Sequence, residues 1–204
     1  MTNKKLLVYL STVLASLIPC PGRFAFGILL VIVFNIVFIL SSLLDYFFKK
    51  LSIAEYSKFF MPLLICSLVT IAYRLIVFFS PIIALQLSFI LYIQAFSIYL
   101  LFFKFDEGNV LSVKDVIRTQ FFNCACYTVL TLAFTLIRDI FGYGCISFPT
   151  PDGVYSLRLF NVSYFTFMNF FASIPGAAVI CAVVISVLLH YNSLKNSQTE
   201  VENE

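Results

Sequence analysis

Cys20 is the side chain best placed for metal chemistry. It lies between Pro19 and Pro21 at the end of the first apolar run, where two prolines interrupt any helix. A cysteine thiolate can ligate an iron–sulfur cluster, but one thiolate cannot hold a cluster alone. Cys20 is therefore a candidate metal and cofactor ligand only if the other ligands come from elsewhere.

The other residues of catalytic type indicate packing rather than chemistry. Cys124 and Cys126 are two residues apart, so on a helix their side chains would point to nearly opposite sides. His190, the one histidine, lies near the end of the last apolar run, where we interpret it as an interfacial or capping residue. The sequence contains no Walker loop, dinucleotide-binding glycine fingerprint or Gly-x-Ser-x-Gly elbow. We interpret most cysteines as small buried apolar residues, among them Cys66, Cys124, Cys126 and Cys181.

Three polar side chains interrupt the apolar runs. Arg74 is a charge within a run, which indicates either a functional site or a side chain that reaches the nearby membrane surface. Asn35 and Gln94 lie in the middle of their runs. They would either bridge helices by hydrogen bonds or line an ion path.

The composition predicts a polytopic integral membrane protein. Of the 204 residues, 61% are apolar and 11% are charged, and the mean hydropathy is +1.01. Soluble domains carry about 45–50% apolar and about 25% charged residues. The formal net charge is only +3 and the basic residues are scattered, which argues against a nucleic-acid partner.

The apolar runs predict an all-α fold of six membrane-spanning helices. A span needs about 20 apolar residues, and the runs are continuous rather than alternating, which excludes a barrel. The expected spans cover 6–19, 24–44, 59–79, 82–103, 121–137 and 162–191, the last interrupted at Pro175-Gly176. They make one membrane domain, 1–191, followed by a hydrophilic tail, 192–204, that we expect to be disordered.

Two connections differ from short polar turns. The Pro19–Gly22 segment is either a simple turn or a broken helix that ends inside the membrane, where irregular backbone must line a cavity or a site. The longest connection, 138–161, is rich in glycine and proline and is expected to be a turn-rich loop on the outer side.

The distribution of basic residues predicts that both termini lie in the cytoplasm. Nine basic residues then lie on the cytoplasmic side: Lys4, Lys5, Lys49, Lys50, Lys58, Lys104, Lys114, Arg118 and Lys195. Four lie on or near the other side: Arg23, Arg74, Arg138 and Arg158.

The chain resembles the paired small membrane subunits of the Rnf electron-transport complex and of the sodium-pumping NADH:quinone reductase. Ile18-Pro19-Cys20-Pro21 resembles the family's Gly-x-Cys-Pro element. Arg138-Asp139-Ile140-Phe141-Gly142-Tyr143-Gly144 is similar to an Arg-Glu…Gly-x-Gly element after the fifth span, and Pro175-Gly176-Ala177 to the step that opens the last span. Length, the six expected spans and cytoplasmic termini favour the E-type subunit, and the resemblance implies a location in the bacterial inner (plasma) membrane.

This resemblance implies two inverted three-helix repeats, with half-helices at the first and fourth spans. It also implies a [2Fe–2S] cluster shared with a sister A-type subunit, electron transport coupled to sodium or proton movement, and further Rnf-type subunits as partners. The family's second cysteine is absent here, because the corresponding stretch, 92–97, contains none. Only Cys20 therefore carries over as a cluster ligand. A cluster held by three cysteines and another fourth ligand, and a subunit that has lost the cluster, are both open alternatives.

Two other functions fit the same sequence. A substrate-binding subunit of a vitamin-type importer also has six helices, and mid-span polar residues with many aromatic ones suit an organic ligand. A purely scaffolding subunit of an Rnf-type complex needs no metal. In each case the chain is not itself an enzyme. Arg138 and Asp139 are interpreted as anchors of the last helical turn at the membrane surface, with no catalytic role.

Overall fold

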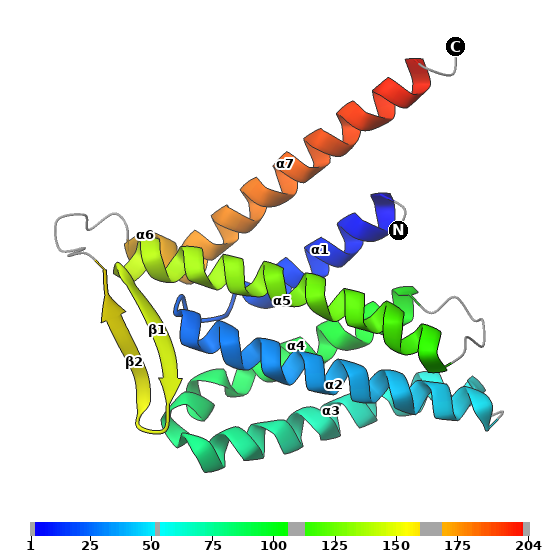
Figure 1. Ribbon diagram of the computed structural model, residues 1–204, viewed down its shortest axis with the longest axis horizontal. Helices are drawn as coiled ribbons and strands as arrows, with labels where there is room; N and C mark the ends of the chain where they lie inside the picture. The colour runs from blue at the N-terminus through cyan, green and yellow to red at the C-terminus, as the bar shows by residue number, and fades with distance from the viewer. Residues whose placement is uncertain (1–2, 52–53, 106–112, 160–168, 202–204) are drawn as a thin grey trace.

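The chain folds as a bundle of long helices with a two-stranded hairpin across one end (Figure 1). The computed structural model describes residues 3–51, 54–105, 113–159 and 169–201. The elements are α1 (Asn3–Leu17), α2 (Phe24–Lys50), α3 (Ala54–Phe79), α4 (Pro81–Phe105), α5 (Val113–Tyr143), β1 (Cys145–Thr150), β2 (Gly153–Arg158), α6 (Asn169–Ala172) and α7 (Ile174–Val201).

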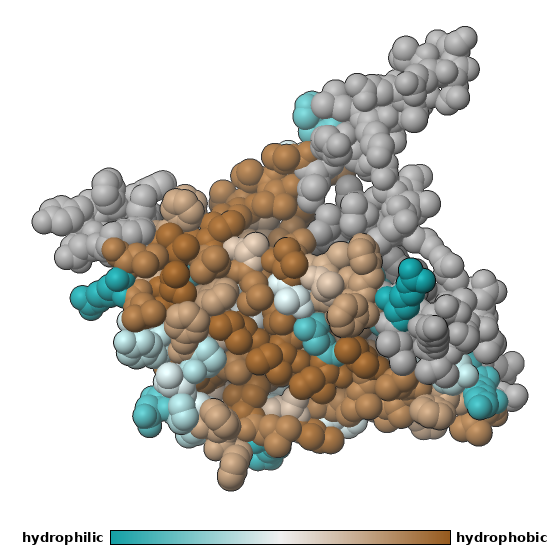
Figure 2. Space-filling model, viewed as in Figure 1, coloured by the Kyte–Doolittle hydropathy of each residue, from teal (hydrophilic) through white to brown (hydrophobic). Residues whose placement is uncertain are grey.

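Four helices in the described part of the chain are long and apolar enough to cross a membrane. They are Phe24–Lys50, Phe59–Phe79, Pro81–Leu101 and Gln120–Tyr143. Apolar side chains also cover most of the visible described surface (Figure 2), as expected where lipid is the solvent. The prediction of a multi-pass helical membrane protein is confirmed at this level.

The first and last helices are less complete as spans. With 15 residues, α1 is about 22 Å long, which is shorter than the roughly 30 Å hydrocarbon core. In α7 the apolar stretch among the described side chains covers Ile174–Val187, and Leu188 and Leu189 follow it in the sequence before His190. Six spans therefore stay a prediction, although the helices run back and forth between the two ends of the bundle and both termini lie away from the hairpin (Figure 1).

The breaks in the helices differ from those expected. The predicted half-helix at the fourth span is wrong, because α4 is continuous and contains no proline or glycine after its first residue. The predicted break after the first helix is present, between Leu17 and Phe24. A second break separates α6 from α7 at Ser173, just before Pro175. Residues 162–168 of the expected sixth span lie outside the described part of the chain.

The segment after residue 137 is more regular than a turn-rich loop. α5 continues to Tyr143, six residues past the expected end of the fifth span. The chain then forms an antiparallel hairpin in which Cys145 pairs with Arg158 and Thr150 with Gly153. Pro151 and Asp152 make the turn. The alternating pattern of the strands was hidden by the glycines and prolines around them.

The last helix also runs further than expected. α7 continues to Val201, through most of the hydrophilic tail for which we predicted disorder. Its residues beyond the apolar part are polar helix formers that include lysine, glutamine and glutamate, which continue a helix without a membrane around it.

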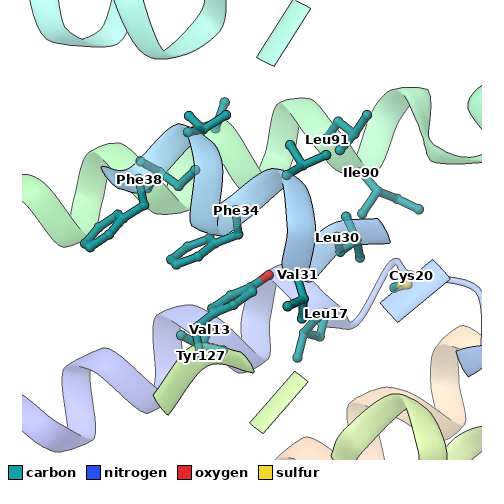
Figure 3. Close-up of a cluster of buried hydrophobic side chains, with 14 of the residues drawn as sticks. Val13, Leu17, Cys20, Leu30, Val31, Phe34, Phe38, Ile90, Leu91 and Tyr127 are labelled. Atoms are coloured by element: carbon teal, nitrogen blue, oxygen red, sulfur yellow. The ribbon is translucent and has the colours of Figure 1, made fainter. Parts of the chain in front are cut away.

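The core lies between α1, α2, α4 and α5. Phe34 of α2 stacks on Tyr127 of α5, with ring centroids 3.5 Å apart and planes 5° apart (Figure 3). Val13 and Leu17 of α1 approach the same cluster from the other side (Figure 3). α2 packs chiefly against α5, and α3 against α4, while α1 contacts α4, α7 and α5.

Candidate functional site

The first helix break is a short irregular segment enclosed by the bundle. The Cys20 amide donates to the Leu17 carbonyl at 3.1 Å, and the Arg23 amide donates to the Pro21 carbonyl at 2.8 Å. The prolines remove two backbone donors, which leaves the segment unable to continue either helix. The helix ends on both sides of the break therefore need partners from elsewhere.

Asp139 supplies the partner for the N-terminus of α2. Its Oδ2 accepts from the Phe24 amide at 3.0 Å. The same oxygen accepts from the Ser147 amide at 2.7 Å and from the Ser147 hydroxyl at 2.5 Å. Ser147 Oγ in turn accepts from the Ala25 amide at 3.2 Å. A carboxylate at this position also interacts favourably with the positive end of the α2 dipole.

The hairpin is attached to the bundle through this carboxylate. Ser147 lies on β1, and the thiol of Cys145, at the start of the same strand, is 3.4 Å from Asp139 Oδ1. Burial, and next the negative charge of Asp139, raise the pKa of Cys145 to about 11, so this thiol stays protonated. Asp139 thus joins α5, the start of α2 and β1.

Arg138 binds backbone carbonyl oxygens at both helix breaks. We call the place where the two breaks meet the end of α5 the junction. Nη1 of Arg138 donates to the Cys20 carbonyl at 2.7 Å, within the first break. Its Nε donates to Phe171 O at 3.2 Å, and its Nη2 to Ala172 O at 2.9 Å and to Ser173 O at 3.2 Å. These last three carbonyls belong to α6 and the second break. One guanidinium therefore holds both breaks against α5, using the fork of donors that arginine alone provides.

Two glycines permit the close approach that these bonds require. A Cβ on Gly142 would lie 2.5 Å from the Ala172 Cβ. A Cβ on Gly22 would lie 2.7 Å from the Ala172 carbonyl oxygen. Real Cβ atoms essentially never approach so closely, so the first break, α5 and α6 meet around Ala172 only because both positions lack a side chain.

The interpretation of Arg138 and Asp139 as anchors at the membrane surface is wrong. Both lie in the last turns of α5, as expected, but neither side chain is exposed. The signal that could have identified them is a charged pair followed closely by Gly-x-Gly at the end of an apolar run. Charges in such a setting are tolerated only when fully hydrogen-bonded within the protein.

A cavity of about 460 Å³ lies beside the first break. It is bounded by the break, the first turns of α2 and α4, the end of α5 and β2. Its lining residues are Pro21, Arg23, Phe26, Ile82, Ile83, Gln86, Tyr143 and Val154. The sequence did not predict this cavity, because its walls come from five separate segments.

Cys20 does not fit an iron–sulfur cluster shared with another subunit. Its side chain is 0% exposed and packs in the chain's own core, beside Leu17 and Leu30 (Figure 3). Among the described residues there is no group of three or more histidine, cysteine, aspartate or glutamate side chains that could hold a metal ion. A shared cluster requires a sulfur that another protein can reach.

The mid-span amides join helices, which confirms the helix-bridging interpretation. Asn35 Nδ2 donates to Thr128 Oγ1 at 3.0 Å, linking α2 to α5. Gln94 Nε2 donates to the Leu30 carbonyl at 2.8 Å and to the Tyr127 hydroxyl at 2.9 Å, linking α4 to both of those helices. Gln94 is buried, so these bonds lie in the core.

The other candidate residues lie apart from the junction. Arg74 is exposed near the end of α3, where its side chain points outward and can extend towards the membrane surface. His190 is exposed on α7. Cys124 and Cys181 are buried as predicted, whereas Cys126 is half-buried and Cys66 is exposed.

Comparison with known proteins adds one similar sequence. An uncharacterized protein of Treponema pallidum (strain Nichols) is 27% identical to this chain over 183 residues, which cover 89% of this chain and 86% of the relative. The similarity thus extends along most of both chains. No protein-family model matches the chain, and no solved structure matches it.

Proposed function

We propose that this chain is the substrate-binding membrane subunit of a small-molecule transport system. The observation that carries the proposal is the cavity beside the first helix break, lined by Pro21 and Arg23 of the break and by residues of α2, α4, α5 and β2. The chain itself would bind rather than transform its ligand, and other subunits would drive transport.

A helix break of this kind is a favourable place for a ligand-binding site. Irregular backbone at membrane depth is tolerated where it is enclosed by protein or lines a cavity, and helix breaks in transporters form substrate sites for this reason. Here one side of the break is enclosed by Arg138, and its other side contributes to the cavity. The volume of about 460 Å³ lies in the range of roughly 300–1,000 Å³ that is common for small-molecule pockets.

The proposal includes six spans with both termini in the cytoplasm of a bacterial inner membrane. The ends of α2 and α4 and the starts of α3 and α5 lie away from the hairpin, as do both termini (Figure 1). Most of the lysines lie at or near these helix ends. This excess of basic residues favours that side of the membrane as the cytoplasmic one. The hairpin, whose β2 strand contributes to the cavity lining, then lies on the outer side.

Mass spectrometry of small molecules retained by the purified chain tests this function. Ile82 is exposed at the cavity, so Ile82→Trp fills the space without entering the core. Ile36→Trp, on the exposed face of α2 and outside the lining, is the matched control. We expect a ligand with the wild type and the control and none with Ile82→Trp. Equal retention by all three, or none by any, contradicts the proposal.

A second candidate function is a non-catalytic subunit of an Rnf-type ion-translocating electron-transport complex, acting as a scaffold beside an A-type sister subunit. Its support is that the element from Arg138 to Gly144, which carries most of the resemblance, holds the two helix breaks together. Because the Cys20 thiol is enclosed, this candidate assigns the chain no cluster ligand and no electron-transfer step.

Affinity purification distinguishes the two candidates. An Rnf-type scaffold is expected to co-purify with its sister and with flavin-bearing subunits, and the complex should fail to assemble without this chain. A stable and active complex in cells that lack the chain would exclude the second candidate and leave the first untouched.

A further inference from the structure

We propose that the cavity binds the anionic group of an amphipathic ligand, a phosphate or a carboxylate, with Arg23 as its principal cation. This inference rests on the proposed function, because it names the class of ligand taken by the same cavity. Four features of the lining carry it: a positioned arginine, the N-terminus of α4, the absence of a lining acid and an apolar wall.

Arg23 is held at the cavity but is not neutralised. Its Cζ lies 5.2 Å from the centroid of the Tyr143 ring, a cation–π contact that restricts the side chain. Among the described residues, no acidic side chain forms an ion pair with Arg23. The guanidinium therefore keeps donors that can form charge-assisted, bidentate hydrogen bonds with a phosphate or carboxylate.

The N-terminus of α4 borders the same space. α4 begins at Pro81, and residues of its first turn line the cavity. Helix N-termini attract anions through the helix dipole and through amides that lack a partner within the helix. The N-terminus of α2 does not contribute to this attraction, because the Phe24 amide already donates to Asp139 and the Ala25 amide to Ser147.

No acidic residue opposes this positive potential within the described lining. Asp139 is close to the start of α2, but it is fully buried and engaged by Phe24, Ser147 and Cys145. Asp152 lies in the exposed hairpin turn and does not line the cavity. A cationic ligand would therefore meet an uncompensated arginine.

The rest of the lining is suited to an apolar ligand body. Phe26 and Ile83 are buried at the base, while Ile82 and Val154 complete an apolar wall. The amide of Gln86 adds one polar group that can donate or accept. Such a site fits either the headgroup and upper chain of an anionic lipid or a soluble amphipathic acid.

Binding of matched amphiphiles to the full-length chain in neutral detergent tests the class of ligand. The probes are dodecyl phosphate, dodecyl trimethylammonium and dodecanol, which differ only in headgroup charge. The melting temperature is followed by circular dichroism, because the chain contains no tryptophan. We expect stabilisation by dodecyl phosphate alone. Arg23→Gln should weaken that binding by about 10- to 100-fold, as the loss of a charge-assisted hydrogen bond predicts.

Two further variants control for misfolding and for general charge effects. Arg23→Lys keeps the charge but loses the planar fork of donors, so it should bind dodecyl phosphate more weakly than the wild type and more strongly than Arg23→Gln. Arg74→Gln removes an exposed arginine outside the cavity and should bind dodecyl phosphate like the wild type. Equal binding of all three probes, unaffected by Arg23→Gln, would overturn the anion inference but preserve the proposed function. Binding of no probe, together with no retained ligand, would overturn both.

Native mass spectrometry with defined lipids identifies the source of the anion. If the ligand is a lipid headgroup, the wild type should retain phosphatidylglycerol but not phosphatidylcholine, and Arg23→Gln should retain neither. If it is a soluble acid, neither lipid should be retained, while inorganic phosphate should compete with dodecyl phosphate. Either pattern supports an anion site, and equal retention of both lipids by both proteins contradicts it.

Discussion

Arg138 and Asp139 are adjacent on α5, but their side chains bind backbone groups of opposite kind at the same helix break, a carbonyl oxygen and an amide. Arg138 donates to the Cys20 carbonyl inside the break, and Asp139 accepts from the Phe24 amide at the start of α2. Both charges are fully buried. The break is thus held by one fixed cation on its carbonyl side and one fixed anion on its amide side.

Loss of either charge should destabilise the fold strongly. Hydrogen bonds between membrane helices average about 0.6 kcal/mol each, and removal of one member of a buried charged network costs about 3–5 kcal/mol. We therefore expect Arg138→Gln and Asp139→Asn each to lower the free energy of unfolding by about 2–4 kcal/mol. Unfolding in mixed micelles with increasing dodecyl sulfate measures this change. Arg74→Gln is the control, and a loss as small as that of the control would show that the junction is not needed for stability.

The close contacts around Ala172 can be tested by asking whether a second substitution restores the stability that a first one removes. Gly142→Ala places a methyl group against the Ala172 Cβ and should cost about 1–3 kcal/mol, as overpacking does. Ala172→Gly removes that Cβ and should restore part of the loss. Gly22→Ala collides with the Ala172 backbone instead, so the same second change should not rescue it. Rescue of both variants, or of neither, would show that the three segments do not meet as described.

The reactivity of the cysteines reports on the enclosure of the first break. Cys20 is buried, and Cys145 is both buried and raised in pKa to about 11, so neither should react with maleimide in the folded protein. Both should react after denaturation in dodecyl sulfate. An added cysteine on the exposed hairpin, Ser156→Cys, should react at once. Rapid labelling of Cys20 in the folded protein would make its sulfur available to another subunit and would reopen the cluster-ligand hypothesis.

The hydrogen bond between Gln94 and Tyr127 in the core should contribute modestly to the stability of the fold. A double-mutant cycle with Gln94→Leu and Tyr127→Phe is expected to give a coupling of about 0.6–1.7 kcal/mol, the range known for hydrogen bonds between membrane helices. Asn35→Leu with Tyr127→Phe is the control cycle, since Asn35 bonds to Thr128 instead. A coupling near zero in the first cycle would mean that the amide bonds only to the Leu30 carbonyl.

The amino-acid sequence is enough to predict that lipid surrounds much of this protein and where its main helices lie. Long apolar runs without internal breaks, such as Phe24–Lys50 and Pro81–Leu101, must form helices in lipid because their backbone groups have no other partners. It also located the first break, because two prolines around Cys20 cannot continue a helix. The helix-bridging role of Gln94 was predicted from its position alone.

The surroundings of the break, in contrast, depend on how the whole chain folds. The partners of Arg138 lie at residues 20 and 171–173, and those of Asp139 at residues 24 and 145–147. No local rule of spacing brings these segments together. The cavity likewise takes its walls from the break, α2, α4, α5 and β2. Hydropathy and helix propensity act over neighbouring residues, whereas hydrogen bonds to Arg138 and Asp139 depend on which helix ends the folded bundle brings to one place.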